Sequence, residues 1–362
     1  MQKKDQKKSI MVLFGGVSAE HDVSIISAQN VINFINKKKY KVVPIYIDKK
    51  GRWLSFEIKF VSNKSFEFGK VEKEKLNEVF PYSKNGKMFI NAKKEEKIDI
   101  VFPVLHGPYG EDGSMQGFLR ILNVPFVGSG VLGSAVGMDK DFAKRLLRDA
   151  GILVGDFVVI KKDQEKIDFF SIKRKFGLPV FIKPANMGSS VGISKVNNKE
   201  EFFAAVNKAF EYDEKVIIEK NIKGREVECA ILGNEKPQAS IVGEVLVKKG
   251  FYSYSAKYLE KDNAEIVIPA KITNKTLKKI QETAIKTFQV LGCSGFARVD
   301  FFLCPNGRVF VNEINTIPGF TSISMYPKLW QESGIKYEAL IEKLIILAFE
   351  QHKKINSYNK CV

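Results

Sequence analysis

A β-hairpin pattern near the carboxyl end of the chain constrains its fold more than any other feature. Side chains alternate in character along Phe296–Leu303, and a second β-branched segment, Val309–Ile314, follows the dipeptide Asn306-Gly307. Asn-Gly is the strongest short-range signal for a two-residue turn between antiparallel strands. Such a turn pairs Pro305 with Arg308, so the pattern predicts two neighbouring strands of one sheet.

This predicted register brings two carboxylates together. Because strand side chains return to the same face every two residues, Asp300 is expected opposite Glu313, and Arg298 opposite Asn315. Opposed carboxylates repel each other unless a cation neutralises them. Carboxylate and amide oxygens are also the hard ligands that Mg²⁺ prefers. A hydrated surface hairpin with compensating lysines is the alternative, and a slip of one residue would abolish the pairing.

A segment of small residues is a candidate phosphate-binding loop. It reads Lys183-Pro-Ala-Asn-Met-Gly-Ser-Ser-Val-Gly192, and small residues let backbone N–H groups approach an anion closely. The Walker A pattern is absent, and an ordinary glycine-containing hairpin is the alternative. Gly15-Gly16 lacks the G-x-G-x-x-G pattern, so we do not infer NAD binding.

Two polar segments follow predicted strands in the first part of the chain. His106–Gly113 comes directly after Ile98–Val104, an apolar run typical of a buried parallel strand, and Glu20 follows a first strand at Ile10–Phe14. Ligands gather at the carboxyl ends of such strands, although a lone glutamate there is also a common first-turn residue of a helix. No Ser/His/Asp or Cys/His nucleophile set is apparent, which favours phosphate and metal chemistry over covalent catalysis.

The order of the predicted elements indicates α/β architecture followed by α+β architecture. The first part alternates strands and helices, as in a doubly wound domain with a parallel sheet, and ends near Gly128-Ser129-Gly130. The later part has strands joined by turns, as in an antiparallel domain, and we expect Lys353–Val362 to fray. The other expected elements are a helix from Ser18 or Ser24 to about Ile35, helices at Asp139–Ala150 (stopped by Gly151), Asn274–Leu291 and Tyr337–His352, and strands at Val42–Ile47, Leu178–Ile182, Val216–Glu219, Glu226–Leu232 and Ala239–Val247.

The charge of the chain raises one alternative that is not an enzyme. The 58 basic and 41 acidic residues give a formal net charge of +17, which is compatible with a nucleic-acid-binding module. However, only eight of the basic residues are Arg, the usual reader of bases and phosphates. Most of the lysines alternate with Glu and Asp, which is typical of a solvated surface. We therefore expect no nucleic-acid partner.

The remaining composition indicates a globular protein of the cytoplasm. No apolar run approaches the roughly 18 residues that a membrane span needs, and the basic residues before Ile10 are expected to form a disordered stub rather than a signal peptide. We therefore expect no membrane partner. The four cysteines form no C-x-x-C pair and the three histidines are scattered, so the sequence shows no zinc-site pattern.

Taken together, these segments resemble the D-alanine–D-alanine ligase family of the ATP-grasp superfamily over nearly the whole chain. The resemblance implies three domains: an N-terminal α/β domain at 1–129, a central subdomain at 130–219, and a C-terminal domain at 220–362, with ATP between the last two. The matching stretches are Phe14–Ser24, Leu105–Gly117, Val127–Gly130, Met138–Lys140, Lys183–Gly192, Ala256–Tyr258, Gly295–Asp300 and Asn312–Ser322.

The resemblance also implies roles for individual residues. Two Mg²⁺ ions, for which Mn²⁺ could substitute, would be held by Asp300, Glu313 and Asn315. ATP would be bound by Lys140, Lys183, Glu219, Lys220, Ile222 and Glu226. The two D-alanines would be bound by Glu20, His106, Lys257, Ser324 and Met325. Arg298 and the backbone N–H of Gly319 would form the oxyanion hole, and Glu20, Ser189 and Tyr258 would hydrogen-bond to close a lid.

The activity implied is ATP-dependent joining of two D-alanines through an acylphosphate, for synthesis of peptidoglycan precursors, in a homodimer. Ligases that join D-alanine to D-lactate or D-serine on the same scaffold are the alternative, and Tyr258 argues against the lactate form. Ser253 and Ser255 depart from the family, which usually has acidic residues there. The dynamics of the lid are therefore in doubt.

Overall fold

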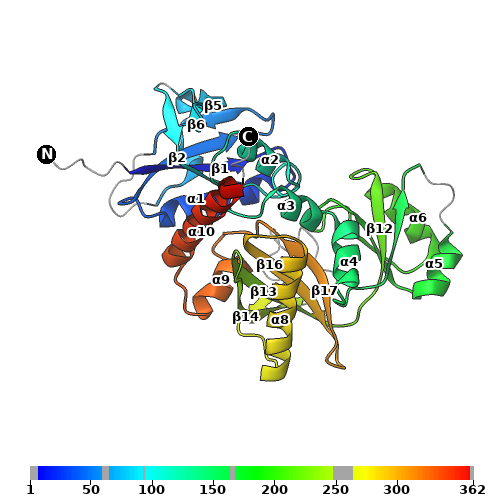
Figure 1. Cartoon of the computed structure of the whole chain (residues 1–362). Coiled ribbons are helices and arrows are strands. Elements are labelled where there is room, and N and C mark those ends of the chain that lie inside the picture. Colours follow the sequence, from blue (N-terminus) through cyan, green and yellow to red (C-terminus); the bar gives the residue numbers. More distant parts are fainter. Residues whose placement is uncertain (1–6, 59–64, 93, 164–167, 248–263, 359–362) are drawn as a thin grey trace.

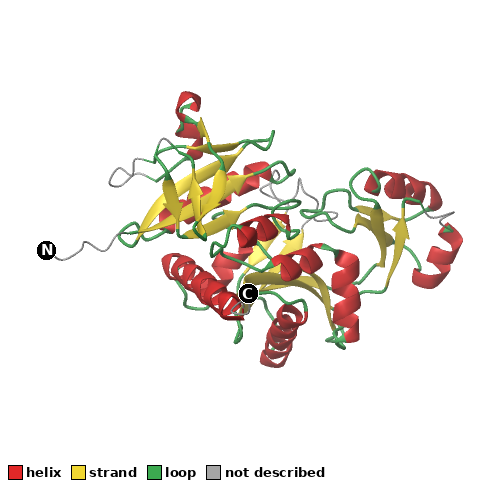
Figure 2. Ribbon diagram, turned by 45° about the horizontal axis from the view of Figure 1, so that its top comes forward, coloured by secondary structure: helices red, strands yellow, loops and turns green. Residues whose placement is uncertain are grey.

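The computed structural model describes residues 7–58, 65–92, 94–163, 168–247 and 264–358. Four sheets organise them into three lobes, which we call N-terminal, central and C-terminal (Figure 1). The central lobe lies at one end of the molecule, while the other two pack closely together (Figures 1 and 2). Among the described residues, no helix is long and apolar enough to cross a membrane.

The N-terminal lobe is built on a five-stranded sheet with a parallel core. Strands β2, β1 and β8 run parallel, as predicted, and two short antiparallel strands extend one edge. A three-stranded antiparallel sheet, which the sequence did not reveal, packs beside it. The strands of the larger sheet are β4 (Asn77–Glu78), β3 (Trp53–Ser55), β2 (Tyr40–Ile47), β1 (Lys8–Gly15) and β8 (Ile100–Val104), and those of the smaller are β5 (Pro81–Lys84), β6 (Lys87–Ile90) and β7 (Glu96–Ile98).

Both faces of β1 are buried, which explains its continuous apolar run. Val12 and its neighbours on one face join the core formed with α1 (His21–Phe34) and α10 (Tyr337–Tyr358). Met11 and Leu13 on the other face join a core that includes side chains of α2 (Ser114–Ile121). Figure 1 shows α10, in red, lying beside α1, so the end of the chain returns to its first lobe.

Three local predictions for this lobe were wrong. Neither Ser18 nor Ser24 caps α1: Glu20 is at the N-cap position, while the Ser24 hydroxyl accepts a hydrogen bond from Gly15 N and donates one to the Val104 carbonyl. The run predicted as one strand, Ile98–Val104, is divided because Asp99 turns its carboxylate to the backbone N–H of Ser9. The C-terminal segment is not frayed up to Tyr358, because α10 continues to that residue; 359–362 lie outside the described residues.

The central lobe is a four-stranded antiparallel sheet with helices on one side. The core between them is formed by apolar side chains of the sheet and of its two helices, Phe169 and Phe202 among them. The strands, in spatial order, are β11 (Ser194–Val196), β10 (Val180–Pro184), β12 (Lys215–Lys220) and β9 (Phe157–Lys161), and the helices are α5 (Phe169–Phe176) and α6 (Lys199–Ala209).

The C-terminal lobe is a five-stranded antiparallel sheet whose two faces belong to different cores. One face packs against α8 and α4, and the other against α9 and α10. The Asp139 carboxylate caps α4 and Gly151, with a φ of +73°, follows its end, in agreement with the prediction. The elements are β15 (Ala264–Val267), β14 (Gln238–Val247), β13 (Arg225–Gly233), β16 (Gly295–Leu303) and β17 (Val309–Asn315), with α3 (Val131–Met138), α4 (Lys140–Asp149), α8 (Asn274–Val290) and α9 (Met325–Glu332). The 3₁₀ turns at Phe68–Lys70 and Lys73–Lys75 belong instead to the N-terminal lobe, between β3 and β4.

The hairpin between β16 and β17 has the predicted register at the carboxylates but not at its turn. Cys304, not Pro305, is paired with Arg308, and Gly307 adopts a φ of +73°, as in a three-residue loop. Asn312 is then an extra residue in β17, because Phe301 pairs with Val311 while Asp300 pairs with Glu313. The longer turn shifts the register by one residue and the bulge shifts it back, so Asp300 pairs with Glu313 as predicted.

Packing of α10 against the first lobe predicts that truncation of two neighbouring aliphatic side chains of this helix lowers stability by different amounts. Leu344 is 1% exposed in the shared core, whereas Ile346 on the same helix is 45% exposed. Leu344→Ala should lower the free energy of unfolding by about 2–5 kcal/mol, and Ile346→Ala by less than about 1 kcal/mol. Urea denaturation of both variants measures this, and equal losses would contradict the described packing.

Candidate active site

Three carboxylates form a row across the C-terminal sheet. The register of β13, β16 and β17 places Glu228 beside Asp300, and Asp300 beside Glu313. Arg298 lies on the same face, with its Nε 2.7 Å from an oxygen of Asp300 and 2.7 Å from one of Glu228. Its Nη2 donates to the other Asp300 oxygen at 2.7 Å, and the Asn315 amide donates to that oxygen at 3.0 Å. The predicted metal ligands and Arg298 are therefore in one cluster.

The carboxylates of this row stabilise the charged form of Arg298. Burial alone would lower the pKa of Arg298, but Asp300 and Glu228 outweigh burial and hold that pKa well above its usual range. Lys140 approaches Glu313 from α4, with 3.7 Å between Nζ and Oε2. Its Nζ also donates to the Met187 carbonyl at 2.6 Å. Lys140 thus joins the row to the predicted phosphate-binding loop.

Two buried lysines pair with one glutamate, Glu219, which lies across a pocket from the carboxylate row. The Glu219 carboxylate lies 2.5 Å from Lys183 Nζ and 2.8 Å from Lys144 Nζ. Burial alone would raise the pKa of Glu219, but the two lysines lower it to about 2. Burial would likewise lower the pKa of Lys183, but Glu219 outweighs it and raises that pKa. The Lys183 ammonium group is therefore held in its charged form by Glu219.

A pocket separates the glutamate from the carboxylate row. One wall comes from the central lobe and α4, with Lys144, Lys183 and Glu219, and the other from β16 and β17, with Phe302 and Glu313. Five of the six residues predicted to bind ATP line this pocket, which places them together as expected: Lys183, Glu219, Lys220, Ile222 and Glu226. Lys140 is not among the lining residues, but it contacts Glu313 and the loop.

The loop after β10 has a strained backbone and is held at both ends. Ser189 and Ser190 have φ values of +48° and +61°, which L-residues rarely adopt. Asn186 N donates to Asp213 at 2.7 Å, and the Ser189 hydroxyl donates to Glu20. A Cβ on Gly188 would lie 3.0 Å from Glu20 Oε2. A side chain at Gly188 would therefore crowd the Glu20 carboxylate.

The Glu20 carboxylate lies where the N-terminal and central lobes meet. A Cβ on Gly107 would come within 2.8 Å of Glu20 Oε2, so the His106–Gly113 segment also passes close to it. Glu20 is 8% exposed. It is therefore positioned by two glycine-containing loops and by the hydroxyl of Ser189. Glu20 and Ser189, two of the three members of the predicted triad, are thus in contact.

His106 and Glu111 fasten a C-terminal loop to the N-terminal lobe. The two ring nitrogens of His106 lie 3.0 Å from the Ile317 carbonyl and 3.3 Å from the Ser27 hydroxyl, and burial lowers its pKa. Glu111 accepts hydrogen bonds from Ile317 N and Gly107 N, at 3.1 and 2.8 Å. Burial, and next the nearby Glu20, raise the pKa of Glu111 to about 8. The fastened loop is the one that carries Gly319.

The predicted residues near α9 lie together. A Cβ on Gly319 would lie 2.7 Å from the Ser324 hydroxyl, which accepts a hydrogen bond from Thr321 N at 3.0 Å. The side chain of Met325 is 4% exposed and packs in the core against Gly243. A contact between Met325 and a substrate would thus have to use its backbone. Lys257 and Tyr258, together with Ser253 and Ser255, lie outside the described residues.

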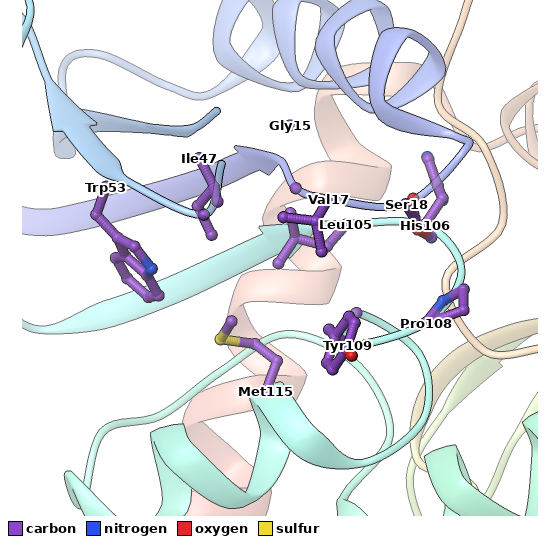
Figure 3. Close-up of a pocket in the computed structure, with 13 residues that line it drawn as sticks. Gly15, Val17, Ser18, Ile47, Trp53, Leu105, His106, Pro108, Tyr109 and Met115 are labelled. Carbon is purple, nitrogen blue, oxygen red and sulfur yellow. Dashed lines mark hydrogen bonds between the residues drawn. The ribbon is translucent and has the colours of Figure 1, made fainter. Parts of the chain in front are cut away.

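A second pocket lies at the carboxyl ends of β1, β2 and β8 (Figure 3). Leu105, Val17 and Met115 give it a largely apolar wall, and Tyr109 stands at its side. Ser18 and His106 line it as well, whereas Glu20 is not among the described lining residues. This pocket is adjacent to the Glu20 carboxylate without enclosing it.

Three functional candidates were missed by sequence reasoning: Lys144, Glu111 and Glu228. Lys144 is one helical turn after Lys140 on α4, a spacing that puts both on one face and could have identified it. Glu111 lies inside a segment that was singled out, but its partner Ile317 is 206 residues away in sequence. Glu228 becomes adjacent to Asp300 only through the pairing of β13 with β16.

Comparison with known proteins finds relatives over nearly the whole chain. Family models described as the D-ala D-ala ligase N-terminus and C-terminus match residues 9–129 and 146–346. The chain belongs to the D-alanine–D-alanine ligase family. It is 48% identical to the D-alanine–D-alanine ligase of Oceanobacillus iheyensis, covering 96% of this chain and 97% of that one. It is 47% identical to D-alanine–D-alanine ligase A of Escherichia coli strain K12, covering 97% and 98%.

Solved structures of ligases share the fold, which confirms the three-domain ATP-grasp architecture expected from the family. The D-alanine–D-alanine ligase of Coxiella burnetii superposes with a TM-score of 0.87 at 37% identity, covering 98% of this chain and 97% of that one. The VanG D-Ala:D-Ser ligase of Enterococcus faecalis gives 0.84 at 39% identity, covering 95% and 100%. The Bacillus anthracis D-alanine–D-alanine ligase complexed with ATP gives 0.72 at 28% identity, covering 96% and 99%.

The shared glutamate predicts a large effect on stability. Glu219→Gln leaves the buried Lys144 and Lys183 without their counter-ion and should lower the free energy of unfolding at pH 7 by about 3–5 kcal/mol. Because the folded pKa of about 2 lies below the ordinary 4.5, the contribution of Glu219 is complete above pH 4.5 and is lost as pH falls toward 2. Denaturation in urea at several pH values measures both effects.

The control is Glu282→Gln, which removes a 66%-exposed carboxylate on α8 at 3.9 Å from Lys278. It should change stability by less than about 0.5 kcal/mol. If Glu219→Gln were equally mild, the buried ion pairs would not be formed in solution.

Proposed function

We propose that this protein joins two D-alanines into D-alanyl-D-alanine, with ATP converted to ADP and phosphate, for the synthesis of peptidoglycan precursors. The observation that carries the proposal is the pocket lined by Lys183, Glu219 and Glu313, with Asp300 paired to Glu313, in a chain of this family. Relatives that are 46–49% identical over nearly the whole chain are named D-alanine–D-alanine ligases.

The pocket has the groups that a nucleoside triphosphate requires. Lys140 and Lys183 are the candidates for contact with phosphate, because both are buried, positively charged groups beside the loop after β10. Glu219, Lys220 and Ile222 would face the adenine, and Glu226 the ribose. The Bacillus anthracis ligase of the same fold is solved in complex with ATP, which supports ATP as the ligand.

The donor set at the carboxylate row fits Mg²⁺. Asp300 and Glu313 are directly paired on neighbouring strands, and Asn315, whose amide N–H donates to Asp300, has an amide oxygen that could serve as a third hard donor. We propose that these residues hold two ions, for which Mn²⁺ could substitute. Bound there, the metal would neutralise charge on the phosphates of ATP.

The amino-acid substrates are assigned to the loops where the three lobes meet. Glu20 would receive the ammonium group of the first D-alanine, with His106 close by. Arg298 and the backbone N–H of Gly319 would stabilise the oxyanion. Ser324 and Lys257 would bind the carboxylate of the second D-alanine beside Met325, and Tyr258 would complete a lid with Glu20 and Ser189.

In the proposed reaction the first carboxylate attacks the γ-phosphorus of ATP, and ADP leaves with the electrons of the broken P–O bond. The amine of the second D-alanine then attacks the acyl carbon, loses a proton, and expels phosphate. Lys140 and Lys183 would neutralise charge on the transferred group. Closure of the lid would exclude water, which hydrolyses an acylphosphate.

A ligase that joins D-alanine to D-serine is the second candidate, because the VanG D-Ala:D-Ser ligase is 39% identical to this chain. The higher identity to D-alanine–D-alanine ligases favours the first proposal. A D-lactate ligase is disfavoured by Tyr258.

Further proposals concern organisation. We propose domain boundaries at 129 and 219, a homodimer, and action in the cytoplasm without a nucleic-acid or membrane partner.

Release of ADP tests the reaction directly. With Mg-ATP near neutral pH, D-alanine alone should support release of ADP and formation of the dipeptide, and L-alanine should not. Release only with added D-serine or D-lactate would keep the ATP-dependent ligation and reassign the second substrate. No release with any pair would refute the proposed function.

The carboxylate row predicts two losses of turnover. Arg298→Ala should lower kcat by about 10²–10³-fold, because one oxyanion donor is removed, and Glu313→Gln should have a comparable effect by weakening the metal site. Circular dichroism establishes that the variants are folded. Lys278→Ala, at a 79%-exposed residue on α8, is the control. Rates like those of the unmodified protein in either test variant would remove that residue from the mechanism.

A further inference from the structure

Glu228 is a buried carboxylate to which neither the resemblance nor the proposed function assigns a role. It is 9% exposed and lies on the central strand β13, in direct register with Asp300 of β16. It is not among the residues that line the ATP pocket, although Glu226, two positions earlier, is. Its carboxylate instead lies 2.7 Å from Nε of Arg298.

Arg298 and a metal ion would compete for the same atoms. The guanidinium donates to both carboxylate oxygens of Asp300, each at 2.7 Å. These are the oxygens that Asp300 would offer to Mg²⁺. A cation bound there would also repel the guanidinium, since both are positive and close together. Arg298 therefore needs another anion if it is to stay in place when the metal is bound.

Glu228 is placed to be that anion. Because strand side chains alternate, Glu228 and Arg298 lie on the same face, two residues apart in register, and the residue directly paired with Arg298 is the small Ala230. The methyl group of Ala230 leaves room for the guanidinium to turn toward the carboxylate row. Glu228 is on the side of Asp300 away from Glu313, so it contacts Arg298 without bordering the other metal ligand.

We propose that Glu228 is a positioning residue that holds the Arg298 guanidinium when Asp300 gives its oxygens to the metal. Glu228 thereby also favours metal binding, because Arg298 can release Asp300 and still be paired with the Glu228 carboxylate. This inference rests on the proposed function of Asp300 and Arg298. It predicts that Glu228 and the metal site are coupled through Arg298 rather than through the charge of Glu228 alone.

The test is a double-mutant cycle with a substitution that conserves charge. Glu228→Asp keeps the carboxylate but shortens the side chain, so that it no longer reaches Arg298. Binding of Mn²⁺ to the full chain, at a fixed concentration of ADP, is followed by electron paramagnetic resonance. Glu228→Asp should weaken Mn²⁺ binding about 10-fold, but by less than about 2-fold when Arg298→Gln is also present.

Two outcomes would overturn the proposal. If Glu228→Asp binds Mn²⁺ like the unmodified protein while Glu228→Gln binds it weakly, only the charge of Glu228 matters. If Glu228→Asp weakens binding equally with and without Arg298→Gln, the effect does not pass through Arg298. Arg298→Lys replaces Arg298→Gln if the latter does not fold, as judged by circular dichroism.

Kinetics give a second readout and separate this proposal from the function on which it rests. At saturating Mg²⁺, Glu228→Asp should lower kcat about 10-fold and leave the KM for ATP within about 2-fold, because the guanidinium is displaced while the ATP pocket is intact. ADP release by the unmodified protein with D-alanine tests the reaction itself. Normal turnover without coupling between Glu228 and Arg298 would refute only this inference. Coupling between these residues without turnover would refute only the proposed reaction.

Discussion

The pairing of Asp300 with Glu313 across β16 and β17 is the constraint on which the rest of the site depends. Two carboxylates in direct register destabilise a sheet unless cations lie nearby. In the described structure Arg298 and Lys140 supply this compensation, the first from the same sheet and the second from α4. The packing of α4 on the C-terminal sheet is therefore both a core contact and an electrostatic one.

Contacts between lobes assemble the rest of the site. The loop that carries Gly319 is held by side chains of the N-terminal lobe, through His106, Glu111 and Ser27, and the Phe320 carbonyl accepts a hydrogen bond from Asn30. Ser189 of the central lobe reaches Glu20 of the first. Each lobe thus contributes residues to the candidate site, and α10 joins two of the lobes through a shared core.

The features that could be predicted from the sequence were those carried by a local pattern or by the family resemblance. Alternation and Asn306-Gly307 identified the hairpin and the Asp300–Glu313 pair, although the turn is one residue longer than expected. The prediction survived because Asn312 forms a bulge, and no local pattern reports that a bulge will cancel a longer turn. The roles of Glu111 and Glu228 could not be read in this way, because each depends on a partner brought close only by the tertiary fold.

The balance of charge around the pocket gives a physical reason for the proposed use of a metal. Lys140, Lys144, Lys183 and Arg298 are linked by ion pairs to Glu219, Glu228, Asp300 and Glu313, so these side chains neutralise one another. The net charge of +17 therefore belongs to the rest of the chain and not to this cluster. A polyphosphate entering a neutral, partly buried cluster brings negative charge that the lysines, already paired, offset only in part. In the proposed reaction, divalent cations that enter with it would supply the missing charge, and Asp300 and Glu313 in the carboxylate row would hold them.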